Sequence, residues 1–240
     1  MDQHEIDLEL IKENAVRIRK KVRDAAERSG RSLEDITLIA VTKTQGVEKI
    51  QHALQAGMLD LGENKVQELC DKYPLVDTEC RWHLIGHLQT NKVKFIIDKV
   101  HMIHSLDRLD LADEIQKRAA KAGRTMDVLV QVNVAGEETK FGIAPEEARS
   151  FVKQLAVYPN LRVRGLMTVA PHVQNPEETR PVFRQLKKIF IDIRQENIDN
   201  INMDYLSMGM SNDYEIAIEE GANMVRIGTA IFGARNYPVK

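Results

Sequence analysis

Short apolar runs alternate along most of the chain with longer segments in which apolar residues recur every three or four positions. Such runs are typical of buried strands, and the longer segments are typical of helices with one apolar face. We expect eight strands, at residues 36–42, 58–62, 82–86, 100–104, 127–134, 162–168, 204–207 and 224–228. The intervening helices are expected at residues 46–56, 64–72, 89–98, 107–122, 145–157, 177–196 and 212–220.

A further helix is expected before the first strand, over residues 5–29. Ile11, Ala15 and Val22 recur on one face of it. The basic residues of its second half could form a nucleic-acid patch, but no aromatic residues are interleaved with them and acidic residues share the helix. A solvated face is therefore the favoured interpretation. We expect this segment, residues 1–30, to pack on the domain that follows.

The alternation of strand and helix indicates parallel strands joined by right-handed crossovers. Eight strands with seven intervening helices match a closed (β/α)8 TIM-type barrel. A doubly wound open sheet is the alternative, but it would predict a glycine-rich dinucleotide turn after an early strand, and the sequence has none. We expect a single domain over residues 1–240.

Composition and charge narrow the function classes. Of the 240 residues, 29% are charged and 43% hydrophobic, and the formal net charge of −2 argues against nucleic acid or an anionic membrane as partner. No uninterrupted apolar run exceeds four residues, so no transmembrane helix is expected. The acidic start lacks the apolar stretch of a signal peptide, which predicts a cytoplasmic location. Cys70 and Cys80 are expected to be reduced thiols, because no second pair completes a disulfide framework or zinc site.

Candidate chemistry should lie just after the strands, because barrels carry their sites at the carboxyl ends. Lys43 follows the first expected strand and has an apolar segment behind it. Partial desolvation lowers the pKa of an amine, and an uncharged amine can form a Schiff base with a carbonyl compound. The alternative is a strand-end lysine whose ammonium simply reaches solvent.

The loops after the last two strands indicate a phosphate site. SMGMS (207–211) and GTAIFG (228–233) each place glycine beside hydroxyl residues directly before a helical segment, where backbone N–H groups can bind an anion. Barrels commonly hold phosphate at these loops. Ser211 could instead be only a helix cap, and Asp213 would repel a phosphate, so we assign it a structural role.

Arg226 lies within the last expected strand, where a buried guanidinium needs a partner. That partner could be an acidic side chain in the barrel or a ligand acceptor such as a ring nitrogen. A carbonyl-reactive lysine, a phosphate site and a ring-facing arginine together indicate pyridoxal 5′-phosphate (PLP).

Two histidine pairs, His83 with His87 and His101 with His104, could suggest a metal site. No acidic or cysteine cluster completes either pair, and His101 and His104 would point to opposite faces of a strand. We therefore expect structural or hydrogen-bonding histidines, no metal and no catalytic residues.

The motifs also carry a resemblance that extends over nearly the whole chain after the first helix. They are AVTKT (40–44), LGENKVQE (61–68), WHLIGHLQTNK (82–92), HSLD (104–107), QVNV (131–134), EETKFG (137–142), GLMTVAP (165–171) and LSMGMSNDYEIAIEEGANMVRIGTAIFG (206–233). With them the chain resembles the PLP homeostasis proteins, single-domain relatives of the alanine racemase barrel.

The resemblance implies that PLP is carried as a Schiff base on Lys43 and that Arg226 faces the pyridine nitrogen. Asn64 and Met167 would be wall residues beside the cofactor. Relatives often have a large residue where this chain has Lys65, which adds a second amine. The phosphate would be held by Ser207, Gly209, Ser211, Gly228 and Thr229.

The resemblance also bears on activity. Alanine racemases add a second, all-β domain and a tyrosine base, and this sequence ends soon after its last expected strand. We therefore expect a monomeric PLP carrier for intracellular PLP homeostasis, without significant catalysis and in transient contact with PLP-dependent apoenzymes. The alternatives are a small PLP-dependent amino-acid racemase, a class I aldolase, and a phosphate-binding barrel without a Schiff base.

Overall fold

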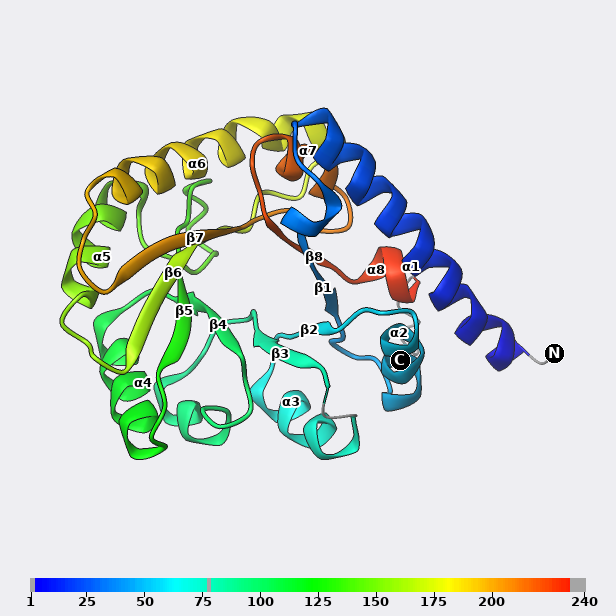
Figure 1. Ribbon diagram of the computed structural model, residues 1–240, viewed down its shortest axis with the longest axis horizontal. Coiled ribbons are helices and arrows are strands. Elements are labelled where there is room, and N and C mark those ends of the chain that lie inside the picture. Colours follow the sequence, from blue (N-terminus) through cyan, green and yellow to red (C-terminus); the bar gives the residue numbers. More distant parts are fainter. Residues whose placement is uncertain (1–2, 77–78, 234–240) are drawn as a thin grey trace.

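Eight parallel strands close into a barrel in chain order, as the computed structural model shows for residues 3–76 and 79–233 (Figure 1). β1 pairs with both β2 and β8, which closes the sheet. The predicted barrel is confirmed, and the doubly wound alternative is wrong. The strands are β1 (Thr37–Val41), β2 (Asp60–Glu63), β3 (Arg81–Leu84), β4 (Met102–Leu106), β5 (Met126–Gln131), β6 (Leu161–Met167), β7 (Ile201–Ser207) and β8 (Met224–Ile227).

Helices surround the barrel and follow the predicted positions except in one connection. The segment 89–98 contains a 3₁₀ helix, η3 (Thr90–Phe95), in place of an α-helix. Its buried Val93 and the buried Ile96 are three residues apart, which suits the repeat of a 3₁₀ turn. The short α8, which ends the described chain, was not predicted. The α-helices after the first are α2 (Val47–Gln55), α3 (Val66–Lys72), α4 (Leu109–Lys121), α5 (Ala148–Leu155), α6 (Arg180–Gln195), α7 (Tyr214–Glu219) and α8 (Thr229–Phe232).

The barrel encloses two different kinds of interior. One part is an apolar cluster of Ile39, Met102, Leu129, Met167 and Met224. The other part is polar. In it Asp60, His83 and His104 are hydrogen-bonded in series, and Ser207 links His104 to Arg226. The larger apolar core lies between the strands and the helices. The barrel is therefore packed along its length, and its polar interior groups must bond to each other.

Helix α1 (Gln3–Arg28) runs along the outside of the barrel and contacts α2, α7 and α8 (Figure 1). Its apolar face, which includes Ile11, Ala15 and Val22, is buried against them. The prediction that this helix packs on the barrel is confirmed. None of the helices described here is long and apolar enough to cross a membrane.

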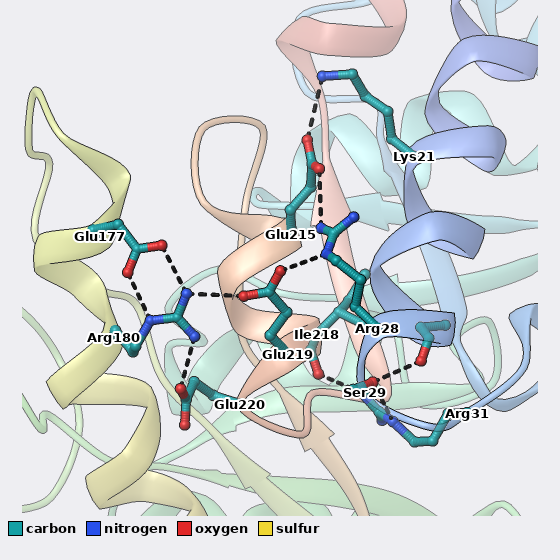
Figure 2. A network of polar contacts seen from close by, with 11 residues as sticks. Lys21, Arg28, Ser29, Arg31, Glu177, Arg180, Glu215, Ile218, Glu219 and Glu220 are labelled. Carbon is teal, nitrogen blue, oxygen red and sulfur yellow. Dashed lines mark hydrogen bonds and ion pairs between the residues drawn. The ribbon is translucent and has the colours of Figure 1, made fainter.

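Charged side chains tie α1 to α7 (Figure 2). Arg28 Nε lies 2.8 Å from a Glu219 carboxylate oxygen, and Lys21 Nζ lies 3.2 Å from Glu215. Arg180, at the start of α6, bonds Glu219 from the other side at 2.8 Å. Single exposed ion pairs contribute little, but a network on one helix restricts its position. α7 follows the SMGMS loop directly, so α1 and α6 together fix the helix behind that loop.

Helix α1 should contribute to the stability of the barrel through its buried face. Val22 is fully buried, whereas Val16 on the same helix is 70% exposed. We expect Val22→Ala to lower the free energy of unfolding by about 1.5–3 kcal/mol, through lost burial and the cavity left behind. The matched Val16→Ala should be neutral or slightly stabilising, because alanine has the higher helix propensity. Urea denaturation of both variants measures this, and equal losses would contradict the packing of α1.

Candidate cofactor site

The predicted site residues gather at the carboxyl rim of the barrel. Lys43 follows β1, Asn64 follows β2 directly, and Met167 ends β6. β1 and β8 are paired, with Ala40 opposite Ile227, so Lys43 and the GTAIFG loop leave the barrel side by side. Segments far apart in the sequence are therefore neighbours at one face.

The loop that carries the half-buried Lys43 is held by its neighbours. Thr42 donates its backbone N–H to the Gly62 carbonyl at 2.9 Å. Thr44 has a left-handed backbone (φ +64°), which is unusual for a β-branched residue, and its N–H donates to Glu68 Oε2 at 2.8 Å. A strained residue persists only where its surroundings fix it. The geometry thus restricts the backbone on both sides of Lys43.

A buried ion pair lies beside this loop, and sequence reasoning missed it. Lys72 Nζ lies 2.6 Å from Glu63 Oε1 and donates to the Thr42 carbonyl at 2.8 Å. The Thr42 hydroxyl donates to the same carboxylate at 2.6 Å. Burial raises the pKa of Glu63, and the bonds to Lys72 and Thr42 oppose that shift. The sequence did not single out Lys72, because a lysine at the end of a short helix ordinarily reaches solvent.

Arg226 is buried in β8 without a carboxylate partner. Its Nη1 donates to Ser207 Oγ at 2.5 Å and its Nη2 to the Thr168 carbonyl at 2.7 Å. Within the described part of the chain, no carboxylate lies within ion-pairing distance of it. Burial lowers the pKa of Arg226 to about 10, and the charge of Asp213 opposes this shift. The guanidinium therefore stays charged at neutral pH while it is held by neutral acceptors.

The loops after β7 and β8 meet at Ser211. Its Oγ accepts the N–H groups of Gly228 at 3.2 Å and Ala230 at 3.3 Å. Gly209 has a φ of +90°, and a Cβ there would lie 2.5 Å from the Ala217 Cβ, so only glycine fits this turn. The two predicted phosphate loops are thus in contact, and two N–H donors of the second loop converge on one neutral oxygen of the first.

The remaining predicted residues of these loops differ in their surroundings. Thr229 is exposed at the start of α8, whereas Ser207 is fully buried and bonded to Arg226. A phosphate role for either stays a prediction. Asp213 accepts the Met210 N–H at 2.6 Å and so holds the turn before α7, as its structural assignment predicts.

The predicted wall residues and the second amine also have defined places. Met167 belongs to the apolar cluster inside the barrel, and the half-buried Asn64 lies against Gly86. A Cβ at Gly86 would lie 2.3 Å from the Asn64 carbonyl oxygen, so this glycine permits the approach. Lys65 is exposed where α3 begins, whereas Lys43 is half-buried. Of these two amines, only Lys43 is partly buried.

Three of the four histidines singled out from the sequence form one cluster. The rings of His101 and His104 both lie edge-on to His83, with centroids 5.5 and 5.1 Å away. His101 lies just before β4, which begins at Met102 and is irregular beyond Ile103, so the alternation of a regular strand does not apply to this pair. His87 stacks on Phe141 instead. No metal-binding group of three or more His, Cys, Asp or Glu occurs among the described residues.

Comparisons with known proteins place the chain in a family. The family profile described as alanine racemase, N-terminal domain, matches residues 6–236. A pyridoxal phosphate homeostasis protein of Aquifex aeolicus (strain VF5) is 47% identical over 226 residues, which cover 94% of this chain and 98% of the relative. The chain belongs to the pyridoxal phosphate homeostasis proteins.

Two solved structures agree with this assignment. A protein of Bifidobacterium adolescentis, described as unknown, superposes with a TM-score of 0.90 at 33% identity and covers 96% of this chain and 97% of that chain. PipY of Synechococcus elongatus PCC7942, solved with PLP bound, has a TM-score of 0.78 at 32% identity and covers 87% of this chain and 100% of that one. The resemblance stated from the motifs is therefore confirmed at the level of family and fold.

The buried His104 of this homeostasis-protein barrel should make the stability depend on pH. Burial lowers the pKa of His104 well below its usual value, so the unfolded chain binds a proton there at higher pH than the folded protein. The free energy of unfolding should fall as the pH drops below about 6.5, by up to about 1.4 kcal/mol per pH unit from this group.

Urea denaturation between about pH 8 and pH 5 measures the effect. His104→Gln should flatten the dependence, because it removes the titrating group. His52→Gln, on the outer helix α2, is the control and should leave it unchanged. A wild-type slope equal to that of His104→Gln would contradict the neutral state of the buried ring.

Proposed function

We propose that this protein binds PLP and carries it for intracellular PLP homeostasis, attached to Lys43 as a Schiff base. The observation that carries the proposal is Arg226, a buried cation that bonds only neutral acceptors among the described residues, at the rim where Lys43 and the two contacting loops meet. A relative named for PLP homeostasis and a relative solved with PLP bound support the same reading.

The residues present fit the three polar ends of PLP. Its aldehyde reacts with an amine, and Lys43 is a half-buried amine of the rim that lies beside the GTAIFG loop. Its phosphate suits the N–H groups of Gly228 and Ala230, which a neutral serine oxygen now accepts at 3.2–3.3 Å. Its ring nitrogen suits Arg226, which would hold that atom as a hydrogen-bond acceptor.

Arginine at the ring nitrogen favours carriage over catalysis. PLP supplies an electron-accepting ring and a reactive aldehyde when it is bound. A guanidinium with a pKa of about 10 remains protonated, so it donates to the ring nitrogen and gives up no proton to it at neutral pH. The ring is then a weaker electron acceptor. We expect PLP-dependent apoenzymes to take the cofactor in transient contacts. A small amino-acid racemase is the alternative activity.

The attachment point can be tested by chemical labelling. After incubation with PLP and reduction with borohydride, peptide mapping should find the label at Lys43, because Lys43 is partly buried beside the two contacting loops, whereas Lys65 is exposed. Lys43→Ala should lose the label and the absorption of bound PLP, whereas the matched Lys65→Ala should keep both. A label on Lys65 or Lys140 in the wild-type protein would refute this attachment and leave PLP binding intact.

Carriage and catalysis are separated by parallel measurements on the loaded protein. Incubation with single-enantiomer alanine should give no change of chirality and no keto acid beyond the rate of free PLP, because a positioned general base, worth about 10²–10⁴-fold, is not expected. Added PLP-dependent apoenzyme should recover its activity. Fast racemisation by the wild-type protein, lost in Lys43→Ala, would replace the carrier by the racemase.

A further inference from the structure

A line of buried hydrogen bonds crosses the inside of the barrel and ends on Arg226. It begins at Asp60, the first residue of β2, which lies 2.9 Å from His83 Nε2. His83 Nδ1 lies 3.0 Å from His104 Nε2, and His104 Nδ1 lies 3.1 Å from Ser207 Oγ. Ser207 accepts from Arg226 at 2.5 Å. Each of these side chains is buried, so no solvent competes for the bonds.

We propose that His83 and His104 are positioning residues for Arg226, holding the Ser207 hydroxyl in the one orientation that leaves its lone pair to the guanidinium. This proposal rests on the proposed function, in which Arg226 meets the ring nitrogen of PLP. It gives a role to His83 and His104, to which the proposed function assigns no contact with PLP.

The donor and acceptor capacities allow one arrangement of hydrogens when both rings are neutral. Asp60 is a carboxylate, because bonds to Arg81 and His83 outweigh the effect of burial and lower its pKa to about 2. It can only accept, so His83 must donate from Nε2. His83 Nδ1 then accepts, and His104 must donate from Nε2. His104 Nδ1 accepts in turn, so the Ser207 hydroxyl must donate to it.

Along this line of hydrogen bonds, every group therefore donates in the direction from Arg226 to Asp60. The charges at its ends favour this direction, because the cation donates into it and the anion accepts from it. Arg81 anchors the far end through two bonds to Asp60, at 2.7 and 2.6 Å. His101 touches the His83 ring from the side without a hydrogen bond to it among the described contacts. Burial lowers the pKa of His104, which agrees with a neutral ring.

These hydrogen bonds determine the orientation of the Arg226 guanidinium in the site. Nη1 and Nη2 are held by two fixed acceptors, Ser207 Oγ and the Thr168 carbonyl. A planar guanidinium held at two points has its plane and its remaining donors fixed. If the Ser207 hydroxyl turned, one of the two points would be lost, and the donor facing a ring nitrogen would no longer be aligned.

The first test uses the protein without cofactor and does not depend on PLP binding. Long-range ¹H–¹⁵N NMR of the histidine rings should show both His83 and His104 as neutral Nε2–H tautomers at neutral pH. In the same samples, the Arg226 Nη signals should be resolved in the wild type and averaged in His104→Phe. An Nδ1–H tautomer or a doubly protonated ring at either position would overturn the proposal.

The second test compares PLP affinities in three variants. His104→Phe keeps a ring but cannot accept from Ser207. It should bind PLP about tenfold more weakly, because a misaligned Arg226 would lose its charged hydrogen bond to the ring nitrogen. His101→Phe is the matched control, because His101 is not part of the line of hydrogen bonds, and it should bind PLP like the wild type. His104→Asn retains an acceptor near the Nδ1 position and should restore most of the affinity. Inorganic phosphate, which the proposed function assigns to the N–H groups of Gly228 and Ala230, should bind all of them equally.

The outcomes separate this proposal from the proposed function. If the wild type failed to bind PLP, the proposed function would be refuted. The tautomers and the Arg226 signals would still test the arrangement of the hydrogen bonds. If the wild type and His104→Phe bound PLP equally, the proposed function would be supported and the positioning role of His104 would be refuted. Should His104→Phe not fold, the wild-type tautomers alone remain sufficient to refute the arrangement.

Discussion

The pairing of β1 with β8 is the constraint on which the site depends. It joins the first strand to the last, so the lysine after β1 and the loop after β8 leave the barrel as neighbours although nearly the whole domain separates them in sequence. An open sheet built from the same elements would place β1 and β8 apart. Closure therefore creates the candidate site, and the helices outside mainly hold the strands in that closed arrangement.

The inside of the barrel contains both apolar side chains and buried polar side chains. The apolar cluster around Met167 fills one part, and the remainder is a set of buried polar groups that bond to one another. An unpaired polar group in such a place would be costly, so the set must be complete to be tolerated. Arg226 differs from the other members of this set, because the described acceptors of its hydrogen bonds, Ser207 Oγ and the Thr168 carbonyl, are neutral.

Two ion-pair systems support the rim from outside. The buried Lys72 and Glu63 lie behind the Lys43 loop, and the exposed network of α1, α6 and α7 lies behind the SMGMS loop. They differ in physical character. The buried pair is protected from water and salt, whereas salt screens the exposed network. Added salt should therefore weaken the ion pairs behind the SMGMS loop more than the pair behind the Lys43 loop.

The sequence by itself determined the eight strands, most of the helices, the barrel and the rim positions, because hydrophobic period and strand-end location are local signals. It also contained the family motifs. It missed the 3₁₀ connection at Thr90–Phe95 and the start of β4, since short apolar segments fit several local structures. Only the tertiary structure decided the partners of Ser207, His104 and Lys72. Those partners come from other strands and helices, and a hydrogen bond between distant residues leaves no periodic trace in the chain.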